Sequence, residues 1–191
     1  MHKFLNNFLK SVLAGIFISV ALIVYINNKT VLDVIVFSVG VISILKLKLN
    51  LFTGMVGYEE NYLKLIISLA GNFLGTYVSS LLLIGKITNF IDLETIIQNK
   101  VSQNLFSVFI SSIVCGMLVY TAIYSYKKDK DIISVILCIS AFVMFNADHC
   151  VANSFYFFVS RNFDNKTILY NLFCILGNYI GSKLCSFTQK I

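Results

Sequence analysis

The sequence has little of what soluble proteins rely on. Among its 191 residues there is no proline and no tryptophan, and only 13% are charged. Soluble chains are about a quarter charged. The low charge, the 58% of hydrophobic residues and a mean hydropathy of +0.83 therefore exclude intrinsic disorder, collagen-like structure and a soluble enzyme. The composition is that of an integral membrane protein.

Metal-ligating patterns are also missing. The chain has two histidines, and its cysteines form no CxxC pair or other metal-ligand spacing. We therefore expect no metal and no cofactor, and we interpret the cysteines as small buried apolar residues. The net charge of +6 fits loops that orient a multi-span protein, so we predict no nucleic-acid partner. The five cysteines are Cys115, Cys138, Cys150, Cys174 and Cys185.

Six apolar segments are present, each too long and continuous for a membrane β-barrel strand, which predicts helices. The second and fifth are too short to cross a hydrocarbon core of roughly 30 Å. Each is followed by a polar, small-residue stretch, at 46–54 and at 146–153, and then by more apolar residues. We interpret these two as broken spans. The six segments cover 4–26, 31–45, 63–84, 105–126, 132–145 and 168–187.

An internal repeat organises these segments. The pattern Gly-Asn-x-x-Gly occurs at 71–75 in the third segment and at 177–181 in the sixth. With the broken spans in matching positions, it predicts one transmembrane domain over 1–191, with halves of about 1–85 and 105–191. Three spans in each half would make an inverted repeat with the two breaks meeting near the bilayer midplane. The alternative is that both pentapeptides only allow close helix packing.

The distribution of lysine and arginine predicts the orientation. With the N-terminus inside, ten of these residues fall on the cytoplasmic side and five outside. This bias favours a multi-pass protein of the cell membrane with both termini in the cytoplasm. The longest hydrophilic stretch, at about 85–104, is then expected to be an external loop.

Two adjacent ionisable residues, Asp148 and His149, lie in the second break. Ionisable groups at membrane depth are functional candidates by default, and a histidine can exchange a proton near neutral pH. A structural histidine bonded to freed backbone is the alternative. In the first break, Thr53 supplies a hydroxyl group, and Lys46 and Lys48 flank the loop. These lysines either extend to lipid headgroups or attract anions.

The ordered motifs resemble the formate/nitrite transporter family, pentameric channels for small monovalent anions with an aquaporin-like protomer. The resemblance rests on residues 8–18, Phe-Ser-Val-Gly-Val at 37–41, Leu-Phe-Thr-Gly at 51–54, Asp-His-Cys-Val-Ala-Asn at 148–153 and both Gly-Asn-x-x-Gly patterns. Several positions differ from the family pattern, including Asp148 in place of a glutamate and Ala147 in place of a phenylalanine. Cys150 replaces a serine, and Gly116 stands where a polar asparagine is frequent.

The resemblance implies a role for each matching residue. His149 would be the central pore histidine, hydrogen-bonded to Thr53, with Asp148 beside it, and the three would take part in proton transfer. Apolar constrictions are expected at Phe37, Val41, Leu51, Phe52 and Phe142. Vestibule residues are expected at Lys100, Asn153, Asn72 and Asn178.

The function expected from these features is a channel or transporter for formate, nitrite or hydrosulfide that depends on pH through His149. Its partners would be these anions, protons, the lipid bilayer and four further copies in a homopentamer. An enzyme is not expected, because one histidine with one aspartate and no nucleophile forms no catalytic constellation. Two alternatives are an aquaporin-like pore for neutral solutes and a non-conducting membrane scaffold. The first would lack the paired Asn-Pro-Ala motifs of aquaporins, since the chain has no proline.

Overall fold

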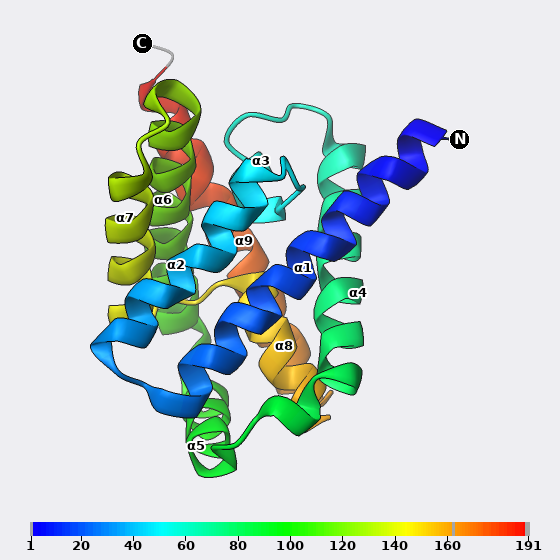
Figure 1. Ribbon diagram of the computed structural model, residues 1–191, viewed down its shortest axis with the longest axis vertical. Helices are drawn as coiled ribbons and strands as arrows, with labels where there is room; N and C mark the ends of the chain where they lie inside the picture. Colours follow the sequence, from blue (N-terminus) through cyan, green and yellow to red (C-terminus); the bar gives the residue numbers. More distant parts are fainter. Residues whose placement is uncertain (1, 162, 190–191) are drawn as a thin grey trace.

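A computed structural model describes residues 2–161 and 163–189, and the secondary structure in these ranges is helical (Figure 1). In chain order the elements are α1 (His2–Asn28), α2 (Val31–Lys46), α3 (Phe52–Met55), α4 (Tyr62–Leu82), the 3-10 helix η1 (Ile84–Lys86), α5 (Phe90–Ser102), α6 (Leu105–Asp129), α7 (Ile132–Met144), α8 (Cys150–Ser160) and α9 (Asn165–Thr188).

Polar residues between the apolar runs determine where the helices begin. The first N–H groups of a helix have no partner within it, and a short polar side chain just before the helix can accept from them. Thr30 does so for α2 in a capping box with Asp33. The other helices capped in this way begin after Asn61, Asn89, Asn104, Asp131 and Asp164.

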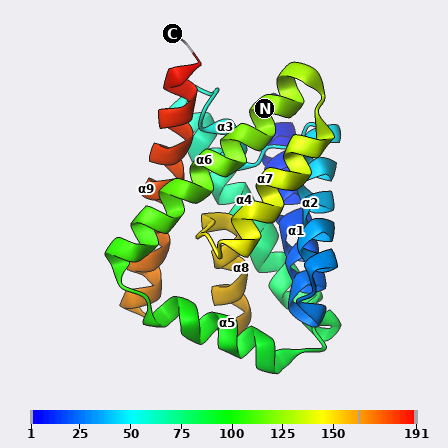
Figure 2. The same ribbon diagram turned by 90° about the vertical axis from the view of Figure 1, so that its left-hand side faces the viewer.

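The long helices pack in two pairs, α1 along α4 and α6 along α9 (Figures 1 and 2). Both contacts depend on a glycine. A Cβ atom on Gly75 would lie 2.1 Å from the carbonyl oxygen of Val12, and one on Gly181 would lie 2.0 Å from that of Ile113. The Gly-Asn-x-x-Gly patterns therefore allow close backbone approach in both halves, which is the packing role considered above.

Both predicted breaks are present. The second apolar segment divides into α2 and the single-turn α3, and the fifth divides into α7 and α8. Within the described residues, α1 over Phe4–Asn28, α4 and α6 are long and apolar enough to cross a membrane by themselves. The helix α9 is long but is not one of these, because its buried side is built from small and polar residues. These include Thr167, Cys174, Gly177, Asn178, Gly181 and Ser182.

The stretch at about 85–104, which was expected to be an external loop, contains the helix α5. This helix lies across the end of the molecule opposite both termini (Figure 2). Asn89 caps it, and Leu93, Ile97 and Lys100 form its buried face. The spacing of these three residues is that of one helix face. Polar residues outnumber apolar ones in this segment, so the helical spacing of its buried residues is difficult to recognise in the sequence.

Candidate functional site

The two broken segments meet at the centre of the protein. Thr53, in α3, and His149, just before α8, are both buried, and Thr53 Oγ1 lies 2.8 Å from His149 Nε2. The structure therefore brings together the two polar side chains that the sequence placed in separate breaks.

An asparagine braces the first break. Asn72, in α4, donates from Nδ2 to the carbonyl oxygens of Ser11 and Asn50, both at 2.8 Å. Its Oδ1 accepts from the N–H of Phe52 at 2.8 Å. A broken helix leaves backbone groups without partners, and at membrane depth only protein can satisfy them. Asn72 thus replaces hydrogen bonds that the break removes.

Asn178 does the same for the second break. Its Nδ2 donates to the carbonyl oxygens of Ser112 at 2.9 Å and Asp148 at 2.8 Å, and its Oδ1 accepts from the N–H of Cys150. The expectation that Asn72 and Asn178 lie in a vestibule is corrected here. Both side chains are fully buried and hold backbone in place.

The hydrogen bonds of His149 determine where its ring carries a proton. Its Nδ1 accepts from the backbone N–H of Ala152 at 3.1 Å, which caps α8. A neutral imidazole has one N–H, so the proton is on Nε2, and Nε2 donates to Thr53 Oγ1. A doubly protonated ring would turn an N–H toward the N–H of Ala152 and lose this cap.

A small cavity of about 10 Å3 lies beside His149. Cavities need about 10–15 Å3 to hold one water. The rings of Phe37 and Phe142 meet edge to face at 5.7 Å, and Phe142 lies 5.8 Å from the imidazole. The residues that line this central cavity are Ile18, Phe37, Val41, Leu51, Val119, Ile139, Phe142 and His149.

Four of the five predicted constriction residues, Phe37, Val41, Leu51 and Phe142, line the central cavity. Phe52 is buried but does not line it. Ile18, Val119 and Ile139 also line the central cavity but were not predicted, because in the sequence they resemble any other apolar residue of a membrane helix.

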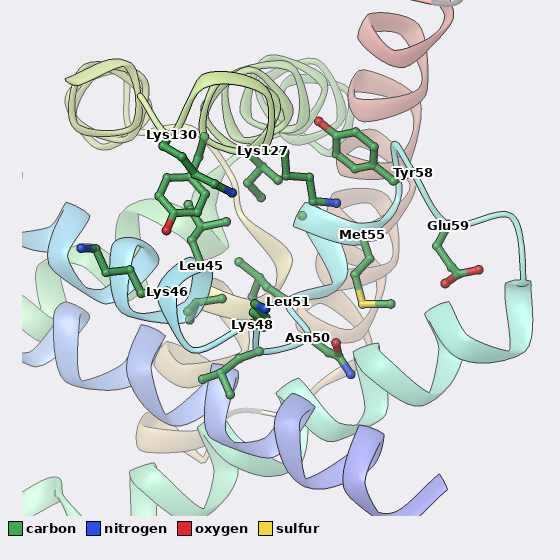
Figure 3. A pocket seen from close by; sticks show the side chains of 15 residues that line it. Leu45, Lys46, Lys48, Asn50, Leu51, Met55, Tyr58, Glu59, Lys127 and Lys130 are labelled. Atoms are coloured by element: carbon green, nitrogen blue, oxygen red, sulfur yellow. The ribbon is translucent and has the colours of Figure 1, made fainter. Parts of the chain in front are cut away.

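Two further cavities adjoin the central one. The wide cavity, of about 670 Å3, opens at the end that carries both termini and shares Leu51 with the central cavity (Figure 3). The outer cavity, of about 40 Å3, shares Phe37 and Phe142 with it and is lined by Lys100 and Asn153, both predicted vestibule residues. The three cavities therefore form a row. Leu51 separates the wide cavity from the central one, and Phe37 and Phe142 separate the central cavity from the outer one.

Asp148 lines none of the three cavities but anchors the second break. Lys100, from α5, lies 2.9 Å from Asp148 Oδ1, and Asn153 Nδ2 donates to the same oxygen at 3.2 Å. The hydroxyl of Tyr170, in α9, also donates to it. Tyr170 was not predicted, because nothing in an apolar helix marks one tyrosine as the partner of an aspartate.

The structure explains the glycine at position 116, one of the departures from the family pattern. Gly116 lies against α9, where a Cβ atom would be 2.4 Å from the carbonyl oxygen of Asn178, so this position has no room for a polar side chain. Cys150 is fully buried, and its backbone N–H is held by Asn178. Within the described residues no group of histidine, cysteine and acidic side chains could hold a metal ion.

The chain is similar to known membrane channels in sequence and in fold. A family model described as "Formate/nitrite transporter" matches residues 1–188. A solved structure titled "Pentameric formate channel with formate bound" matches with a TM-score of 0.85 and 17% identity, covering 99% of this chain and 96% of the other. One titled "FNT family ion channel" matches with a TM-score of 0.78 and 18% identity, covering 95% and 86%. No curated protein matches the sequence.

Proposed function

This chain belongs to the formate/nitrite transporter family, and from that premise we propose that it is a membrane channel for small monovalent anions of weak acids. Formate, nitrite and hydrosulfide are the proposed substrates. One of the similar solved structures is titled as a pentameric formate channel with formate bound. No enzymatic activity is proposed.

The proposed membrane arrangement has six spans in a 3+3 inverted repeat. The equivalent contacts of the two halves support it: Gly75 and Gly181 at the helix crossings, and Asn72 and Asn178 at the breaks. Helices α2 with α3, and α7 with α8, would each form one broken span, and α9 would be the sixth. Shielding of α9 by α6 on its polar side makes this span possible.

We place both termini in the cytoplasm, so that the wide cavity faces the cytoplasm and the outer cavity the outside. Five copies would form a homopentamer in the cell membrane, each with its own pathway. Large exposed apolar side chains support contacts with lipid and with neighbouring copies. Examples are Leu63, Leu82, Phe106, Ile133 and Phe187.

The row of cavities with His149 at its centre carries the proposal. A bare anion pays a high desolvation cost to pass apolar rings such as Phe37 and Phe142, while a neutral weak acid passes at much lower cost. The anion therefore has to gain a proton near His149. The imidazole can give up its Nε2 proton readily only after Nδ1 has taken one, which removes the acceptor of the Ala152 N–H. In this scheme the proton taken up at Nδ1 comes from water, and the charged ring is a short-lived state. Transfer of the Nε2 proton to the anion leaves a neutral ring protonated at Nδ1, so the cap re-forms only after the ring has lost this proton and regained one at Nε2.

We expect His149→Ala and Thr53→Val to reduce formate flux into proteoliposomes about tenfold or more and to flatten its pH dependence. The valine keeps the shape of threonine but removes the hydroxyl that Nε2 contacts. Thr76→Val is the matched control. Thr76 is equally buried and pairs with Ser154 at 2.9 Å, but unlike Thr53 it makes no hydrogen bond to His149. Its flux should stay near that of the unmodified protein.

Unchanged rate and pH profile in both His149→Ala and Thr53→Val would remove these residues from the mechanism. A pore for neutral solutes is the second candidate, because the apolar central cavity has the size of about one water. Osmotic swelling without any dependence on the anion would establish that function. Absence of both kinds of flux would indicate a scaffold.

A further inference from the structure

We propose that the wide cavity binds a phosphate-bearing polyanion and that the bound polyanion closes the channel. The first part stands on the cavity alone. The second part rests on the proposed function, because closure requires a conducting channel.

The size of the wide cavity exceeds what a small monovalent anion needs. Its volume of about 670 Å3 lies within the range of roughly 300–1,000 Å3 that is typical of sites for small organic ligands. The other two cavities in the row hold about 10 and 40 Å3. Leu51 and Gly54 belong to its lining, next to Thr53 in the chain. A ligand in this cavity therefore covers the first constriction.

The wide cavity carries an excess of positive charge. Four lysines line it, with Glu59 as the one acidic lining residue. Glu59 is already paired with Lys64, whose Nζ lies 3.1 Å away. The backbone N–H of Asn61 donates to this carboxyl group and lowers its pKa, so Glu59 is ionised at neutral pH. Within the described chain, none of the four lysines lies within 4.0 Å of a carboxylate. They are Lys46, Lys48, Lys127 and Lys130.

Three of these lysines surround one space. In Figure 3, Lys127 and Lys130 extend from α6 and its end, Lys48 extends from the opposite side after α2, and Lys46 points away. The ammonium group of Lys127 is held 3.6 Å from the centre of the Tyr58 ring, which fixes its position without neutralising it. Three separate ammonium groups suit a ligand with several phosphate charges better than one with a single charge.

The backbone at Lys48 and Lys130 gives an independent observation. Both residues have left-handed φ angles, 53° and 56°, in a conformation that favours glycine. Lys130 is the C-cap of α6, and Lys48 lies two residues after the end of α2, so both are near free carbonyl groups with which a cation interacts well. A capping role alone would be served as well or better by glycine. Glycine variants therefore separate the two roles, because glycine keeps the left-handed turn and removes the charge.

The phosphate groups could belong to a soluble metabolite or to lipid headgroups, and two arms of the experiment distinguish them. In the first, tripolyphosphate binding to the detergent-solubilised protein is measured by calorimetry. In the second, formate flux is measured in phosphatidylcholine vesicles, with and without tripolyphosphate on both sides, and in vesicles that also contain phosphatidic acid. A soluble ligand gives inhibition by tripolyphosphate, and a lipid source gives inhibition by phosphatidic acid.

We expect Lys48→Gly/Lys130→Gly to weaken tripolyphosphate binding at least tenfold and to relieve the inhibition, while the melting temperature stays the same or rises. The matched control is Lys29→Gly. Lys29 also has a left-handed φ, of 51°, but it lines none of the three cavities and pairs with Asp92. Its affinity for tripolyphosphate should not change.

No binding of tripolyphosphate to the unmodified protein together with no inhibition by phosphatidic acid, or equal affinity for tripolyphosphate in the double glycine variant, would overturn the site. Binding without inhibition would overturn the closure. Failure of the unmodified protein to conduct formate in ligand-free vesicles would contradict the proposed function instead, and the calorimetric result would still decide the binding site.

Discussion

Replacing Lys100 by methionine is expected to lower the free energy of unfolding by about 3–5 kcal/mol, the usual cost of removing one partner from a buried ion pair. Lys100 Nζ and Asp148 Oδ1 are 2.9 Å apart, with side chains 5% and 0% exposed. Without the ammonium group, the Asp148 carboxylate would remain buried, with only Asn153 and Tyr170 donating to it. Unfolding in mixed micelles titrated with dodecyl sulfate measures the loss.

The double variant Lys100→Met/Asp148→Asn tests the cause. When both charges are removed, no unpaired charge stays buried, so we expect the double variant to be more stable than Lys100→Met alone. The control is the partly exposed pair Lys29–Asp92, at 3.0 Å, with side chains 28% and 31% exposed. Lys29→Met should cost less than about 1 kcal/mol, as surface pairs do.

Equal losses for Lys100→Met and Lys29→Met would show that the pair does not hold α5 to the second break. Flux measurements on Lys100→Met add a second readout. Because Asp148 immediately precedes His149, a displaced aspartate should also slow formate flux. A stability loss with unchanged flux would separate the anchor from the pathway.

Some of the architecture was predictable because local chemistry fixes it. The polar residues in 46–54 and 146–153 interrupt apolar runs, and the structure has helix breaks there. The pairing of Thr53 with His149 was expected only from the resemblance to a family. Neither composition nor spacing says that two side chains in different halves face one another.

Other features depend on contacts that a sequence does not state. Asn72 and Asn178 stood out as a repeated pair, yet their role as braces appears only when the backbone groups freed by each break are matched with partners. Buried N–H and C=O groups need acceptors and donors, so the search for partners of the backbone groups freed at each break points to these two asparagines. The wide cavity is different. Its lysines come from the ends of α2 and α6, and only the fold brings them together.

The substitution Gly181→Ala is expected to destabilise the protein by about 3 kcal/mol or more, at the upper end of overpacking effects. The added Cβ would lie 2.0 Å from the carbonyl oxygen of Ile113, a backbone atom that cannot move aside alone, so α6 and α9 would have to separate. Gly85→Ala is the control, because nothing lies within 4 Å of a Cβ there. Its unfolding in mixed micelles should change by less than about 1 kcal/mol.

Separation of α6 from α9 should also reach the candidate site. Asn178, one turn before Gly181, holds the N–H of Cys150 and the carbonyl oxygen of Asp148, the two residues on either side of His149. We therefore expect any assembled Gly181→Ala protein to show slower formate flux as well as lower stability. Gly75→Ala should behave alike, because its Cβ would lie 2.1 Å from the Val12 oxygen and Asn72 braces the first break. If either variant matched Gly85→Ala in both measurements, the close helix crossings would not be what positions the two breaks.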